Sequence, residues 1–132
     1  MATSGVVCNL RPRDALKLGQ LCLNGGVWNG TRVIGKDWID RSIRSYGIFI
    51  RPDWDPDHRC GYGWHFHQFT VAGRTYRDYA AEGNGGQLVM VFPELDMVVG
   101  INAGQYGSPL WYRWSLEIIS KYLIPAAAGT GP

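Results

Sequence analysis

The stretch Tyr79-Ala-Ala-Glu-Gly-Asn-Gly-Gly-Gln-Leu-Val-Met-Val-Phe-Pro-Glu-Leu-Asp-Met-Val-Val-Gly-Ile-Asn-Ala-Gly104 decides the fold of this 132-residue chain. Two apolar runs, Leu88–Phe92 and Met97–Ala103, lie on either side of a short polar link that begins with Pro93. This spacing predicts an antiparallel hairpin. Because apolar residues occupy both faces of the first run, we expect it to form a central strand that is covered on both sides.

The residues just before the first apolar run, Gly83-Asn84-Gly85-Gly86, predict a ligand site. Glycine has no side chain, so it lets another molecule approach the backbone closely. We therefore expect Asn84, Gly85 and Gly86 to line a substrate-binding site at the start of the buried strand. The competing interpretation is that Asn84 is a turn residue that tolerates unusual backbone angles and contacts no substrate.

The rest of the pattern predicts an α+β fold, in which helices flank an antiparallel sheet. We expect a turn at Asn29-Gly30, strands near 61–67 and 75–81, and helices over 12–23, over 36–44 and from Ser108 onward. A chain of this length is expected to form a single domain over residues 1–125, with a flexible tail at 126–132.

Helical spacing also predicts which faces of the helices are buried. In the first helix a stripe contains Ala15, Leu18 and Cys22, with Leu16, Gly19 and Leu23 beside it. In the last helix one face carries three aromatic residues and an isoleucine, with Ser115 and Ile119 beside them. We expect the large aromatic side chains to pack in the core rather than to form a ligand box: Trp64, Trp111, Trp114 and Tyr122.

Composition excludes several classes of partner. Lys and Arg number 13 and Asp and Glu 11, and this near balance gives no reason to expect nucleic acid or an anionic membrane surface. No apolar run approaches the roughly 18 residues that a membrane-spanning helix needs. The three cysteines include no CxxC pair, so the sequence predicts neither a full disulfide set nor a zinc knuckle. The compartment stays open.

Two groups of side chains resemble metal ligands, and we interpret neither as a metal site. Asp53, Asp55 and Asp57 have the spacing that begins a calcium loop, but His58 and Trp64 replace the glycine and the carboxylate that complete it. A solvated acidic loop is the simpler interpretation. The histidines and the cysteine of His58-x-Cys60 and His65-x-His67 lack the spacing of zinc ligands. We expect no metal and no cofactor, and partly exposed strand positions for His65 and His67.

The order of motifs along the chain resembles the C-terminal part of serine hydrolases of the β-lactamase-related family, which includes class C β-lactamases, penicillin-binding peptidases and esterases. The resemblance extends from about Gly5 to Leu123. It is carried by five motifs in the same order: Arg13-Asp-Ala-Leu-Lys-Leu-Gly-Gln-Leu-Cys-Leu-Asn-Gly-Gly26, Trp38-Ile39, Gly61-Tyr62-Gly63-Trp64, Gly83-Asn84-Gly85-Gly86-Gln87 and Phe92-Pro-Glu-Leu-Asp-Met-Val-Val99.

The resemblance implies a role for the glycine motif. It places Asn84-Gly85-Gly86 where the family has a triplet of the Lys-Thr-Gly type on an inner strand. It also implies that the backbone N–H of Gln87 is one of two oxyanion-hole donors and thereby a catalytic group. Because the cation and the hydroxyl of Lys-Thr-Gly are missing, the resemblance favours an esterase or amidase-like relative over a β-lactamase.

Two family motifs are absent from the 132 residues. Positions 14, 33 and 118, three before each lysine, hold Asp, Val and Ile, so there is no Ser-x-x-Lys, and no tyrosine is followed by x-Asn. A serine nucleophile needs such a base within hydrogen-bond reach. We therefore expect the C-terminal portion of a hydrolase for small ester, amide or peptide-like substrates, inactive alone because an N-terminal segment is missing, and prone to self-association. The alternative is a non-catalytic binding or interaction module of the same fold.

Overall fold

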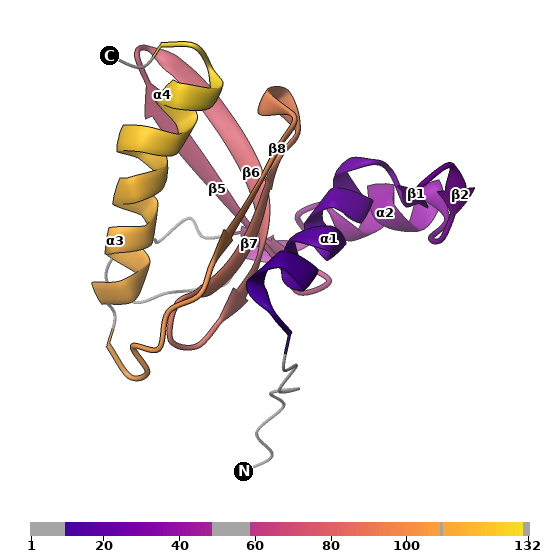
Figure 1. Cartoon of the computed structure of the whole chain (residues 1–132), viewed down its shortest axis with the longest axis horizontal. Coiled ribbons are helices and arrows are strands. Elements are labelled where there is room, and N and C mark those ends of the chain that lie inside the picture. The colour runs from indigo at the N-terminus through magenta and orange to yellow at the C-terminus, as the bar shows by residue number, and fades with distance from the viewer. Residues whose placement is uncertain (1–9, 49–58, 109, 131–132) are drawn as a thin grey trace.

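The structure, a computed structural model that describes residues 10–48, 59–108 and 110–130, is built on an antiparallel sheet with helices on both faces (Figure 1). The fold class is α+β, as predicted. The six strands lie side by side in chain order: β3 (Gly47–Ile48), β4 (Arg59–Gly61), β5 (Trp64–Val71), β6 (Arg74–Gly83), β7 (Gln87–Phe92) and β8 (Met97–Ile101).

The remaining elements precede, connect or follow these strands. The helical ones are α1 (Pro12–Leu23), α2 (Lys36–Ser42), the short 3-10 turn η1 (Pro93–Leu95), α3 (Leu110–Ile118), the π-helical η2 (Ile119–Leu123) and α4 (Ile124–Ala127). A separate two-stranded ribbon consists of β1 (Val27–Trp28) and β2 (Thr31–Arg32), joined by the predicted turn at Asn29-Gly30.

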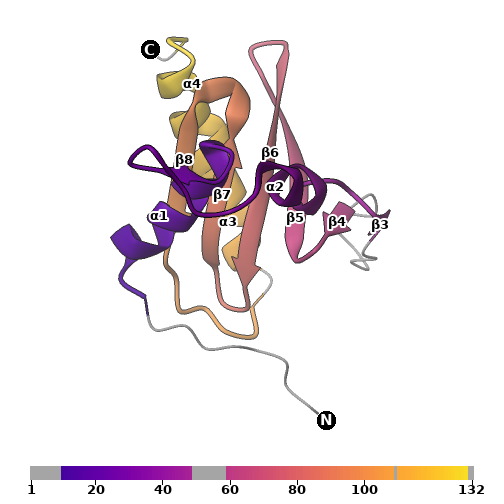
Figure 2. The ribbon, with the colours of Figure 1, turned by 90° about the vertical axis from the view of Figure 1, so that its right-hand side faces the viewer.

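Strand β7 is the central strand that the apolar run predicts. It pairs with β6 on one side and with β8 on the other, and η1 forms the predicted link to β8. Helix α1 crosses one face of β7 and β8, and the C-terminal helices lie behind the opposite face (Figure 2). A glycine makes the first contact close: a Cβ added to Gly19 would lie 2.6 Å from Val98 and 2.9 Å from Val89. The missing side chain lets α1 pack directly on the sheet.

The opposite face of the sheet carries the main core. Leu88, Met90 and Phe92 of β7 are almost completely buried there. They pack with side chains from β5, β6, β8 and the C-terminal helices: Phe69, Tyr76, Ala80, Val99, Ile119 and Ile124. The alternation of inward and outward side chains along β7 thus serves two different helical layers.

Two predicted buried stripes are partly wrong. In α1, Gly19 is buried but Leu18 is 55% exposed. In the last helix Ser115 and Ile119, four residues apart, face the sheet, which turns the predicted face toward solvent. Three predicted core side chains are therefore largely exposed: Trp114, Ile118 and Tyr122. The amphipathic pattern of this helix is ambiguous because apolar residues occur on most of its surface.

Three further boundaries differ from the prediction. Tyr62 and Gly63, both with positive φ, form a turn that divides the predicted strand at 61–67 into β4 and β5. Helix α2 ends at Ser42 rather than at residue 44. Helix α4 continues through Ala127, so it includes the first two residues of the predicted tail, whereas residues 131–132 lie outside the described part.

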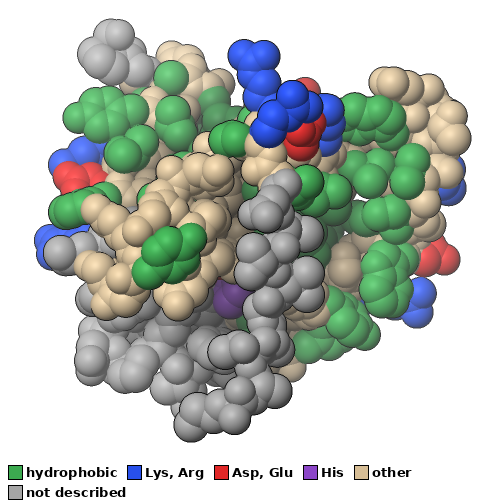
Figure 3. All heavy atoms as spheres, turned by 60° about the horizontal axis from the view of Figure 1, so that its bottom comes forward, with side chains coloured by type: hydrophobic (Ala, Val, Ile, Leu, Met, Phe, Trp, Pro, Cys, Tyr) green, Lys and Arg blue, Asp and Glu red, His purple; other side chains and the backbone are tan. Residues whose placement is uncertain are grey.

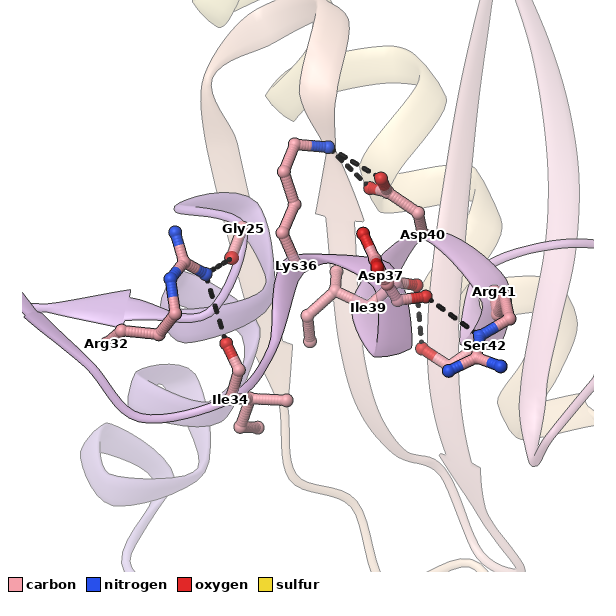
Figure 4. Close-up of polar contacts among 9 residues, drawn as sticks. All are labelled: Gly25, Arg32, Ile34, Lys36, Asp37, Ile39, Asp40, Arg41 and Ser42. Carbon is pink, nitrogen blue, oxygen red and sulfur yellow. Dashed lines mark hydrogen bonds and ion pairs between the residues drawn. The ribbon is translucent and has the colours of Figure 1, made fainter.

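Side-chain hydrogen bonds hold the segment between α1 and α2 (Figure 4). The guanidinium of Arg32 donates to the backbone carbonyls of Gly25 and Ile34, at 3.1 and 3.2 Å. Lys36 forms an ion pair with Asp40 one turn later in α2. These contacts lie at the surface, so each contributes little to stability, but together they define how the chain passes from α1 to α2.

Candidate functional site

The predicted substrate residues form the turn between β6 and β7. Asn84 is exposed at this turn, whereas Gly85 and Gly86 are buried and Gln87 is partly buried. Gly85 and Gly86 have φ values of 119° and 96°, which favour glycine strongly over other residues. The structure therefore brings the four predicted residues together at one end of the central strand.

The segment between β8 and α3 lies against this glycine turn. The backbone N–H of Gln105 donates to the carbonyl of Gly85 at 3.0 Å. The side-chain amide of Gln87 donates to the carbonyl of Ala103 and, at 3.3 Å, to the hydroxyl of Tyr106. These hydrogen bonds join residues 103–107 to the turn. We call this segment the 103–107 strap.

The surroundings of the turn limit what a ligand can reach. β7 has a strand on either side, so the turn lies at the end of an internal strand and not along an open sheet edge. With Gly85 and Gly86 buried, the accessible part of the turn is Asn84 and the exposed portion of Gln87. A ligand that approaches Gly85 has to displace the Tyr106 ring, which belongs to the strap.

A second group of polar side chains lies on β5 and β6. Its histidines, His65 and His67, were considered from the sequence as metal ligands, whereas its two carboxylates were not singled out. His67 and Asp78 face each other across these strands, and their side chains are 5% and 0% exposed. The Nδ1 atom of His67 lies 3.0 Å from Asp78 Oδ2, and the backbone N–H of His67 donates to Asp78 Oδ1 at 2.9 Å. The aspartate therefore binds both the ring and the backbone of the histidine.

The other ring nitrogen of His67 meets a second carboxylate. Its Nε2 atom lies 2.9 Å from Glu82 Oε1, and the Glu82 side chain is 5% exposed. His65, two residues away on the same face of β5, lies 4.0 Å from the other oxygen of Glu82. We call His65, His67, Asp78 and Glu82 the polar cluster. The expectation of a partly exposed His67 is wrong, because the residue is buried.

The polar cluster changes the protonation of its members. Burial alone lowers the pKa of His67, but hydrogen bonds to Asp78 and Glu82 and their negative charges outweigh it and raise the pKa to about 9. Burial also raises the pKa of Asp78, against the lowering effect of its bonds with His67. At neutral pH His67 is therefore an imidazolium between two carboxyl groups, and a protonated ring is unable to act as a general base.

The His67–Asp78 pair was within reach of sequence reasoning. Ala72 and Gly73, both with positive φ, form a two-residue turn between β5 and β6. Such a turn sets the register, because residues equally distant from it face each other. His67 lies five residues before Ala72, and Asp78 lies five after Gly73, so they are opposite. That Glu82 bends back to the second nitrogen is a matter of side-chain packing.

A pocket of about 1020 Å³ lies beside the polar cluster rather than beside the glycine turn. None of residues 84–87 is among its described lining residues. Charged, polar, aromatic and aliphatic side chains from several elements line it: Ile43, Ser45, Arg59, Phe66, His67, Gln68, Phe69, Arg77, Asp78, Tyr79, Pro93, Glu94 and Leu116.

Metal ligands do not converge in the described part of the chain. Within residues 10–48, 59–108 and 110–130, no group of three or more His, Cys, Asp or Glu side chains is placed to hold a metal ion. Both ring nitrogens of His67 already contact carboxylates. His58 and the aspartates at 53, 55 and 57 lie outside the described residues.

Comparison with known proteins does not assign the chain to a family. A scan against models of known families found no match, and a search of curated proteins found no similar sequence. Among the described residues, no helix has the length and the apolar character needed to cross a membrane.

Proposed function

We propose that this chain is the C-terminal portion of a serine hydrolase that resembles the β-lactamase-related family and acts on an ester, amide or peptide-like substrate. In this proposal the nucleophile and its base come from polypeptide outside the 132 residues. This chain supplies one wall of the site, formed by Asn84, Gly85, Gly86 and Gln87.

One observation carries the proposal: two consecutive glycines with positive φ lead directly into the buried central strand. Glycines in this position allow an acyl group to lie against the backbone. The backbone N–H of Gln87 would donate one of two hydrogen bonds to the oxyanion of a tetrahedral intermediate. Loss of such a donor typically raises the barrier by about 3 kcal/mol.

The first test asks whether the chain alone has serine-dependent activity. We expect no saturable hydrolysis of a chromogenic ester or a chromogenic cephalosporin, and no covalent labelling by a fluorophosphonate, because the 132 residues contain no Ser-x-x-Lys. Saturable turnover together with covalent labelling would show that the nucleophile belongs to this chain. It would contradict the proposal that the nucleophile and its base come from other polypeptide.

The second test asks whether the turn recognises an oxyanion. Ethyl methylphosphonate is a tetrahedral monoanion that mimics the intermediate of acyl transfer. Titration of ¹⁵N-labelled protein should shift the amide resonances of Gly86 and Gln87, with a dissociation constant in the millimolar range. Gly73, in a glycine-containing turn at the other end of β6, serves as the internal control. A titration that moves neither resonance, both in the wild type and in Tyr106→Ala, contradicts the proposed site.

A non-catalytic interaction module is the second candidate, and two observations favour it. β8 lies at one end of the sheet and has a described neighbour on one side only, which suits pairing with a strand of another chain. Hydrophobic side chains also gather over α1 and α2, on the right in Figure 3. The large exposed ones near these elements include Leu18, Val33 and Trp38.

The interaction module predicts association in solution. Light scattering should show a mass above that of the monomer at micromolar concentration, and Trp38→Ser should reduce it because Trp38 is 51% exposed. Arg113→Ser, an exposed change on α3, is the control. A monomer at all concentrations contradicts this module, and it also contradicts the self-association expected of a hydrolase portion that lacks its N-terminal segment.

A further inference from the structure

The ring of Tyr106 occupies the space beside Gly85. A Cβ added to Gly85 would lie 2.8 to 3.2 Å from three atoms of this ring, so the ring fills the position that a side chain or a ligand would take. Gly85 is buried for this reason. Tyr106 itself is 71% exposed, the highest value among the large apolar and aromatic side chains of the described residues.

Among the described residues, few hydrogen bonds hold the ring and the backbone beside it. The Tyr106 hydroxyl accepts a hydrogen bond from Gln87 at 3.3 Å, and the neighbouring backbone bond joins Gln105 to Gly85. Most of the ring already faces water, so moving it away exposes little additional apolar surface. Glycines at positions 104 and 107 flank the two residues that would move, and Gly107 has a φ of 76°. The backbone on either side of Tyr106 is therefore free of the usual steric limits.

We propose that Tyr106 is an access-controlling residue of the glycine turn, and that its ring must swing away from Gly85 before an acyl group can bind there. This inference rests on the proposed function, because it concerns entry to the same site. The structure holds the closed arrangement. The apparent affinity for a ligand at Gly85 is then the intrinsic affinity reduced by the fraction of open protein.

The experiment is the titration with ethyl methylphosphonate, carried out on four proteins and followed at the amides of Gly86 and Gln87. Tyr106→Ala removes the ring and should bind about tenfold more tightly than the wild type, because no closed state competes. Tyr106→Phe keeps the ring and loses only the hydrogen bond of the hydroxyl, so we expect it to bind the phosphonate about threefold more tightly than the wild type. Tyr122→Ala removes another strongly exposed tyrosine, located in η2, and should bind like the wild type.

The outcomes separate this inference from the proposed function. If none of the four proteins, Tyr106→Ala included, binds the phosphonate, both the proposed function and the access-controlling role of Tyr106 are refuted. If Tyr106→Ala and the wild type bind the phosphonate equally, or the variant binds it more weakly, the proposed site is supported and the access-controlling role of Tyr106 is refuted. A gain that Tyr122→Ala shares would also refute it. Matching amide spectra away from the strap verify that each variant is folded.

Discussion

Glu82 of the polar cluster lies on β6 only a few residues before the glycine turn, but different physical effects hold the cluster and the turn in place. In the cluster, charge and hydrogen bonding fix His67 between two buried carboxyl groups. At the turn, the absence of side chains allows a backbone conformation and a ring contact that other residues exclude. The comparison teaches that the polar group beside the pocket is held by charge, whereas the residues of the proposed site are covered by a ring.

The largest effect is expected when the cluster loses its most buried member. Asp78→Ala removes the hydrogen bonds that Asp78 makes with the His67 ring and with its backbone N–H, and we expect a loss of about 3 to 5 kcal/mol in the free energy of unfolding. Urea denaturation at pH 7 measures it. Asp40→Ala breaks the exposed ion pair with Lys36 and should cost less than about 0.5 kcal/mol. Equal losses in both variants would remove the distinction between the cluster and the surface.

The pH dependence of stability tests the charge of the cluster directly. The pKa of His67 is raised from 6.5 to about 9 in the folded protein, so its contribution is complete below pH 6.5 and is lost as the pH rises through 9. Up to about 3 kcal/mol should disappear over this window. Urea denaturation at pH 6.5, 8 and 9.5 follows the loss. In His67→Gln this part of the pH dependence should vanish. If the loss of stability between pH 6.5 and 9 persists in this variant, other groups cause it.

A smaller effect is expected from steric changes at the turn. Gly85→Ala should cost about 2 kcal/mol, because the backbone has a φ of 119° and the new Cβ meets the Tyr106 ring. In a Tyr106→Ala background the cost should fall to about 1 kcal/mol. Gly73→Ala is the matched change. The backbone at Gly73 has a positive φ, but a Cβ added there would have no close neighbour. A double-mutant cycle without coupling between positions 85 and 106 would argue against the ring contact.

The smallest effect concerns the fastening of the strap. Gln87→Ala removes the bonds to Ala103 and Tyr106, and we expect at most about 1 kcal/mol of lost stability. Local opening should respond more clearly, with amide hydrogen exchange at Gln105 about fivefold faster. Gln68→Ala, an exposed change on β5, should leave that rate unchanged. If both variants exchange alike, Gln87 does not hold the strap.

Much of the fold follows from local pattern. The two apolar runs predict the β7–β8 hairpin, and Pro12 with Asn24-Gly25 predicts the limits of α1. The burial of the last helix was predicted on the wrong face, because apolar residues surround it and only contact with the sheet selects Ser115 and Ile119. Tyr62 was missed as a turn residue because a tyrosine with positive φ is unusual.

The candidate sites also include features that the sequence predicted and features that it did not. Glycine clusters are visible in sequence, so residues 84–86 were singled out; they were predicted to be a substrate-binding site, with a turn at Asn84 as the competing interpretation. Tyr106 gave no such signal, since the contact joins residues about twenty positions apart. The polar cluster was also missed, although the two-residue turn at Ala72-Gly73 could have placed His67 opposite Asp78.

The sequence by itself determined the α+β class, the central strand and the glycine turn, because these depend on residue spacing and on local backbone freedom. Only the tertiary structure decided that Tyr106 covers Gly85, that His67 is a buried imidazolium, and that the pocket lies beside the cluster rather than the turn. Those features arise from contacts between distant residues, where burial and charge act together and no local pattern records the outcome.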